Sequence, residues 1–172
     1  MSVGEWAIRW TVWLALIGWV AHPIAASWRR DEVRVQRIAR RLYTIGWIWF
    51  VVHVAVAMHV AYGWSHEAAI AATAADVERV TGTADGRGYW VNYAFLLLWL
   101  VDVLWWWRAG LNGYRRRPTW LAGGLFAILA FVTFNATVVF PTGPIRWIGA
   151  AVTVALTGLG VRGLIERRSV VA

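Results

Sequence analysis

The chain has no cysteine and no lysine among its 172 residues. Without cysteine there is no disulfide, no thiolate nucleophile, no Cys-ligated zinc and no cysteine-held iron–sulfur cluster. The absence of lysine beside 17 arginines is typical of GC-rich coding, so Arg at a given position carries little chemical meaning. Serine is scarce and lies outside the long apolar segments. Serine-based acyl or peptidase chemistry therefore has little support.

Charge is also low, because only 15% of the residues are charged whereas 60% are hydrophobic. A soluble domain carries charge on about a quarter of its residues. The apolar residues form several segments near the length of about 20 residues that a membrane-spanning helix needs. The composition predicts an all-α integral membrane bundle, with residues 1–172 as one membrane domain in contact with the lipid bilayer.

The arginines are clustered, and 13 of the 17 lie in residues 29–41, 108–117 and 162–168. Neutral or acidic connections alternate with these clusters. Because Arg is retained on the cytoplasmic side, the pattern predicts an N-terminus outside and a C-terminus in the cytoplasm. The pattern thus predicts a multi-pass membrane protein whose basic segments face the cytoplasm. The basic clusters flank spans, so we expect contact with anionic headgroups and no binding of nucleic acid.

Apolar runs and helix signals predict five transmembrane helices and one outer helix. Ser65 can cap the outer helix, whose apolar stripe is too interrupted by charge to span a bilayer. We also expect a short surface helix within residues 33–42 and small residues of the last span facing its neighbours. The predicted spans are residues 6–26, 42–63, 89–107, 119–140 and 145–164, with the outer helix at 66–80. Most of the 15 tryptophans lie near span ends, where they anchor a helix at the interface.

Two polar side chains fall in the inner half of the predicted bundle. With a rise of ~1.5 Å per residue, His22 lies roughly 6 Å and Asp102 roughly 8 Å from the inner ends of their spans. A buried carboxyl must be neutral or paired, so His22 and Asp102 form a candidate pair. The pair could handle protons or contact a quinone, or it could be a structural link between spans. A Trp N–H or a partner subunit could also satisfy Asp102.

A second group of polar residues falls at the outer side of the bundle. On the same scale His53 lies near mid-depth, roughly 17 Å from the inner end. The outer candidates could form a functional site or a hydrogen-bonded set that holds the outer helix to the bundle. They are His59, His66, Glu67, Asn92 and Asn135.

We expect no cofactor, and two alternatives remain open. Copper or zinc could bind His59, His66 and Glu67, but only if the helix breaks between residues 63 and 65, because seven helical residues separate the histidines by ~10 Å. A b-type haem would need axial ligands on two helices, for which His22 and His53 are the candidates.

The run from His59 to Trp107 resembles a pattern in small multi-pass bacterial membrane proteins of no assigned activity. The matching pieces are His59, 64–66, 72–74, Gly82, Tyr89, 92–93, Trp99, Asp102 and 105–107. The resemblance covers less than a third of the chain. It implies a bacterial inner-membrane protein and no particular chemistry.

No catalytic motif is present, which favours a non-enzymatic role. The leading hypothesis is an accessory or interaction subunit of a larger respiratory or photosynthetic membrane assembly, with other membrane proteins as partners. The first alternative is a haem- or metal-binding redox protein that uses the span histidines. The second is a small proton-coupled carrier or quinone-interacting protein that uses Asp102, His22 and His53.

Overall fold

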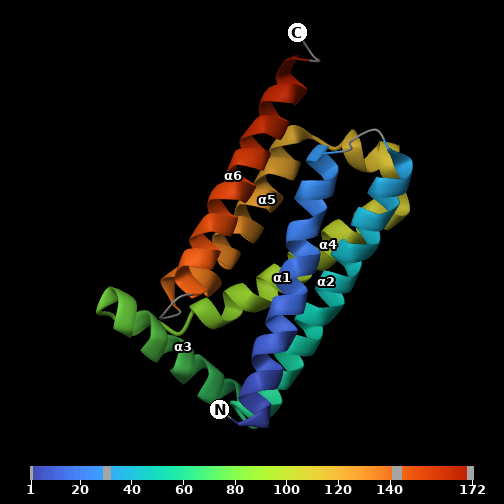
Figure 1. Ribbon diagram of the computed structural model, residues 1–172. Helices are drawn as coiled ribbons and strands as arrows, with labels where there is room; N and C mark the ends of the chain where they lie inside the picture. Colours follow the sequence, from blue (N-terminus) through green and yellow to red (C-terminus); the bar gives the residue numbers. More distant parts are fainter. Residues whose placement is uncertain (1, 29–31, 141–144, 170–172) are drawn as a thin grey trace.

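The computed structural model describes residues 2–28, 32–140 and 145–169, except for the side chains of 26–28, 145 and 160–169. The described chain is helical, with no strand, and forms the predicted membrane bundle (Figure 1). Among the described residues, four helices are long and apolar enough to cross a membrane, and a fifth has a shorter apolar stretch, Arg146–Leu159. The marked N- and C-termini lie at opposite ends of the bundle (Figure 1).

Helices α1 (Val3–Trp28) and α2 (Val33–Val60) pack closely side by side. They cross where Gly18 of α1 meets Gly46 of α2. A Cβ atom added to Gly18 would lie 2.5 Å from the Gly46 Cα and 2.7 Å from the Leu42 carbonyl oxygen. The two backbones are therefore in direct contact, which only glycine permits. Pro23 lies inside α1 and does not end it.

The start of α2 corrects the prediction of a separate surface helix. Residues 33–42 form the first turns of α2 and continue into the span without a break. Arginine favours helix strongly, and no glycine or proline occurs between Val33 and Gly46, so the helix has no reason to stop. The helix that contains the span predicted at 42–63 therefore begins nine residues earlier, at Val33, and ends at Val60.

Helix α3 (His66–Thr81) confirms the predicted outer helix at 66–80. The Ala68 amide donates to the Ser65 hydroxyl at 3.1 Å, as an N-cap requires. Gly63 and Trp64 have positive φ values of 55° and 63°, so the chain turns sharply between α2 and α3. At its other end, the Arg79 guanidinium donates to the Phe140 carbonyl at 2.9 Å. This bond ties α3 to the end of the fourth span.

Helix α4 (Gly88–Arg115) is longer than the predicted span 89–107 and bends near its end. Gly110 has φ 64° and ψ −174°, which are not helical values. Glycine adopts this conformation readily because it has no Cβ. Ahead of α4, hydrogen bonds from Arg87 lower the pKa of the exposed Asp85 carboxyl to about 2. The Asp85–Arg87 ion pair therefore stabilises the loop before α4.

The fourth span consists of α5 (Thr119–Phe134) followed by one π-helical turn, η1 (Asn135–Val139). Together they match the predicted span 119–140. Helix α6 (Ile145–Ser169) matches the predicted start at 145 and packs against α5, η1 and α1. Gly149 of α6 lies against Thr137, because a Cβ at this position would be 2.6 Å from the threonine hydroxyl. Large apolar side chains cover the outside of the bundle, as lipid contact requires.

Candidate functional site

Asp102 lies at the centre of a buried polar cluster, toward the end of the bundle where α2 begins and α4 ends (Figure 1). Its Oδ2 accepts hydrogen bonds from the Tyr43 hydroxyl at 3.0 Å and the Tyr114 hydroxyl at 2.7 Å. Its Oδ1 accepts a hydrogen bond from Nη1 of Arg117, which also forms an ion pair with it. The Arg117 and Asp102 side chains are only 8% and 4% exposed. We call Tyr43, Asp102, Tyr114 and Arg117 the Asp102 cluster.

Aromatic rings enclose this cluster. The Trp106 and Tyr114 rings stack with centroids 4.5 Å apart and planes at 7°. The Arg117 guanidinium carbon lies 3.9 Å from the centroid of the Tyr114 ring, a cation–π contact. This shell excludes water, so the attraction between Asp102 and Arg117 is stronger than it would be at a surface.

His22 lies in the aromatic shell and not on the carboxylate. Its ring centroid is 4.7 Å from that of Tyr43 and 4.8 Å from that of Trp106. Within the described residues no hydrogen bond joins His22 to Asp102. The predicted His22–Asp102 hydrogen bond is thus not formed, and the partners of Asp102 are two tyrosines and an arginine.

The bend at Gly110 explains how these partners reach Asp102. Tyr114 and Arg117 follow Asp102 by 12 and 15 residues, which is ~18 Å and ~22 Å along a straight helix. At Gly110 the backbone leaves the helical path and returns the end of α4 toward Asp102. Sequence reasoning missed this because Arg117 belongs to a basic cluster that is typical of a cytoplasmic loop. The signal that could have predicted the bend is Gly110, which lies between the intramembrane Asp102 and the following Tyr114 and Arg117.

The cluster is suited to holding helices together. Tyr43 comes from α2, Asp102 and Tyr114 come from the two parts of α4, and Arg117 comes from the chain just after it. The carboxylate therefore links α2, the two parts of α4 and the segment after α4. The predicted alternative, an indole N–H of Trp99 or Trp106, is not among the donors to Asp102 in the described residues, and the buried Trp99 Nε1 has no partner there.

A second candidate site is a cavity of about 200 Å³ in the half of the bundle next to α3. Residues from α1 to α5 and η1 line it, and most of the lining is apolar. His53 and Asn92 contribute polar groups, together with three tyrosines: Tyr62, Tyr89 and Tyr93. The His53 Nδ1 lies 3.1 Å from the Ile8 carbonyl and 3.2 Å from the Thr11 hydroxyl. We call this space the outer cavity.

The structure places only part of the predicted outer group around this cavity. The His66 Nδ1 is hydrogen-bonded to the Tyr89 hydroxyl, which is 2.8 Å from the hydroxyl of Tyr93. Asn92 lines the cavity directly. The other three candidates make different contacts: His59 accepts from the Trp64 indole at 3.3 Å, Asn135 donates to the Phe131 carbonyl at 2.8 Å, and Glu67 is exposed in the first turn of α3.

The arrangement gives no support to the metal and haem alternatives. Among the described residues, no three His, Asp or Glu side chains gather as a metal site requires, although His59, His66 and Glu67 are all described. His53 contacts α1 at Ile8 and Thr11, whereas His22 lies 11 residues beyond Thr11, or ~16 Å along the helix. Two ligands at such different depths do not reach the same haem iron.

A search for similar proteins finds no matching family, no matching curated protein and no matching solved structure. Function must therefore be inferred from the chain's own geometry.

Proposed function

We propose that this protein is a non-catalytic accessory subunit of a larger membrane assembly, of the respiratory or photosynthetic kind. The proposal is supported by the way the chain uses its polar side chains. Asp102, His53 and His66 each contact groups of a second helix or of the segment after the Gly110 bend. A carrier would need Asp102 to be free to contact its cargo, yet both carboxylate oxygens are occupied by Tyr43, Tyr114 and Arg117. These contacts favour a structural role.

The observation that carries the proposal is the open face of α6. Gly149, Leu156 and their neighbours face the bundle, whereas Ala151, Ala155 and Gly158 on the other side of the helix are exposed. No atom outside the helix lies within 4 Å of where a Gly158 Cβ would be. Small residues four apart let another transmembrane helix approach closely. We therefore infer that a helix of a partner subunit packs against this face.

Substitution of Ala155 by Leu tests this contact. A bulky side chain should hold the partner helix away, so the variant should lose the polypeptide that copurifies with the wild type from native membranes in mild detergent. Ala94→Leu is the matched control, because Ala94 is an exposed alanine of α4. It should retain the partner. If the wild type runs alone as a monomer in several mild detergents, the subunit proposal fails.

The proposed orientation has the N-terminus outside and the C-terminus in the cytoplasm of a bacterial inner membrane. It is supported by the charge pattern, because the Arg-rich start of α2 and the Arg-rich end of α4 lie at one end of the bundle (Figure 1). The loop before α4 lies at the other end. A cysteine introduced at residue 84 should react with an impermeant reagent added to whole cells, and one at residue 35 should not. The reverse labelling would overturn the orientation.

A second candidate function is binding of a quinone head group in the outer cavity. Its volume of about 200 Å³ suits a single ring, since an apolar cavity of ~150 Å³ holds benzene. A quinone ring also needs hydrogen-bond donors for its carbonyls, and His53, Asn92 and the three tyrosines supply polar groups around an apolar lining. This site shares only His53 with the residues predicted for a quinone-interacting protein, because Asp102 and His22 do not line the cavity.

Filling the outer cavity should remove this binding. Ala57 lines the cavity, so Ala57→Phe should abolish saturable quenching of tryptophan fluorescence by a short-chain ubiquinone analogue. Ala55→Phe, on the same helix at an exposed position, should leave the quenching unchanged. Saturable quenching that is equal in both variants would place the quinone elsewhere, and its absence in the wild type would remove the candidate.

A further inference from the structure

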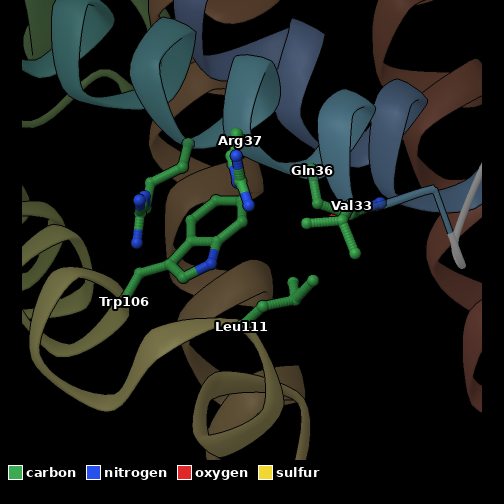
Figure 2. A pocket seen from close by; sticks show the side chains of 6 residues that line it. Val33, Gln36, Arg37, Trp106 and Leu111 are labelled. Atoms are coloured by element: carbon green, nitrogen blue, oxygen red, sulfur yellow. The ribbon is translucent and has the colours of Figure 1, made fainter.

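A basic groove lies between the start of α2 and the end of α4. It has a volume of about 200 Å³ and is separate from the outer cavity. Figure 2 shows Val33, Gln36 and Arg37 on α2 facing Trp106 and Leu111 across the groove. Arg40 completes the lining. We call these six residues the basic groove.

The α2 lining residues occupy one helical face. Val33, Gln36, Arg37 and Arg40 are spaced by three, one and three residues, which aligns them on successive turns. Two guanidinium groups therefore point to the same space. Arg37 is exposed, and within the described residues no acidic side chain pairs with Arg37 or Arg40. The start of α2 adds the partial positive charge of a helix N-terminus.

Arg40 has a donor without a partner. Its Nε is shielded from solvent and makes no hydrogen bond with any described group. Its guanidinium carbon lies 4.0 Å from the centroid of the Trp107 ring, so the side chain is held in place. A shielded and unsatisfied N–H beside a second cation favours an oxyanion ligand, because such a ligand would accept from both arginines.

The depth of the groove indicates a lipid ligand. Its cations lie in the first two turns of α2, and Trp106 and Trp107 belong to the aromatic run near the end of the apolar part of α4, as expected at the headgroup level. Leu104 and Trp107 are exposed on α4 ahead of Leu111 and offer an apolar surface for acyl chains. Basic pockets between transmembrane helices bind anionic headgroups in this way.

We propose that the basic groove is a specific site for the phosphate group of an anionic phospholipid. Arg37 and Arg40 bind the phosphate oxygens, Gln36 lies beside them as a further polar group, and the acyl chains follow α4 into the bilayer. The site does not depend on the accessory-subunit proposal, because it uses α2 and α4 and not the open face of α6.

Native mass spectrometry of the purified protein tests the site. The protein is equilibrated with an equimolar mixture of phosphatidylglycerol and phosphatidylcholine in detergent, and the first bound lipid is identified. The wild type should prefer phosphatidylglycerol, and the double variant Arg37→Gln, Arg40→Gln should lose that preference by about tenfold, since each arginine near the surface contributes to binding of an anionic lipid. The double variant Arg34→Gln, Arg41→Gln removes the same charge from α2 at exposed positions outside the groove and should keep the preference.

Two outcomes would overturn the proposal. Equal loss in both double variants would mean that net charge, and not the groove, attracts the lipid. Displacement of phosphatidylglycerol by inorganic phosphate at equal concentration would identify a soluble phosphate as the ligand.

The melting temperature in lipid-free detergent is the control for folding. If the groove variant melts at the same temperature as the control variant, its loss of lipid binding is not a loss of folding. If the groove variant is less stable than the control, the single variant Arg37→Gln is used in its place, because Arg37 is exposed. It should also lower the preference for phosphatidylglycerol.

Discussion

Replacement of Asp102 by Asn is expected to lower the free energy of unfolding by about 3–5 kcal/mol, because it leaves the Arg117 guanidinium buried without its counter-charge. The Arg117 side chain is only 8% exposed, so water would restore little of its hydration. Its Nε already lacks a partner among the described residues. Denaturant unfolding in detergent micelles, followed by circular dichroism, measures the loss.

Two further variants separate the charge from the hydrogen bonds. Tyr43→Phe removes one donor to Asp102 and keeps the ion pair, so it should cost only about 1 kcal/mol. Combining Asp102→Asn with Arg117→Gln removes both charges and should recover most of the loss caused by Asp102→Asn alone. If the Asp102→Asn variant is as stable as the wild type, the Asp102 cluster is not what holds this end of the bundle together.

The second large effect is expected at the crossing of α1 and α2. Gly18→Ala adds a methyl group where a Cβ would lie 2.5 Å from the Gly46 Cα. The obstacle is backbone, so no side chain can rotate away and the helices must separate. Overpacking of this kind costs about 1–3 kcal/mol. The same unfolding measurement should show the decrease, and the separation should also weaken neighbouring α1–α2 contacts such as that of Thr11 with His53.

Gly123→Ala is the matched control for Gly18→Ala. Gly123 also lies inside an apolar helix, but no atom outside the helix lies within 4 Å of where its Cβ would be. Alanine there should be neutral or should stabilise the helix by about 0.5–1 kcal/mol, because it restricts the unfolded chain. If both glycine variants lose the same stability, the close approach of α1 and α2 is not the cause.

The buried polar groups divide the bundle into two regions with different properties. At the end where α2 begins and α4 ends, the Asp102 cluster packs two tyrosines and an arginine with the stacked Trp106 ring. At the end next to α3, the tyrosine and histidine side chains leave the outer cavity beside them. The Asp102 cluster thus links helices, and ligand binding is expected in the outer cavity or at the basic groove, which Trp106 also lines.

Helix positions could be predicted from the sequence because they depend on local properties. The apolar runs set where α1, α4, α5 and α6 begin to within a few residues. Ser65 and Gly82 mark the two ends of α3 through local capping geometry. The start of α2 was placed wrongly because residues 33–42 were interpreted as a separate surface helix, although arginine continues a helix as readily as leucine does.

Asp102 and His22 could also be identified from the sequence, because a polar side chain within an apolar segment needs a partner wherever it lies. Their partners could not be identified. Tyr43 is 59 residues from Asp102, and Arg117 is a member of a cluster that resembles any cytoplasmic loop. Nothing in the local pattern separates Arg117, which is buried, from Arg116, which is exposed.

What the sequence determined alone is the membrane character of the chain, the order of its apolar helices and the capped outer helix. These follow from transfer of apolar residues out of water and from hydrogen bonds between near neighbours. The tertiary structure decided which charges are buried together and where space remains. Both depend on the backbone path at Gly110 and on the direct contact of Gly18 with Gly46, and such packing geometry is set by residues distant in the chain.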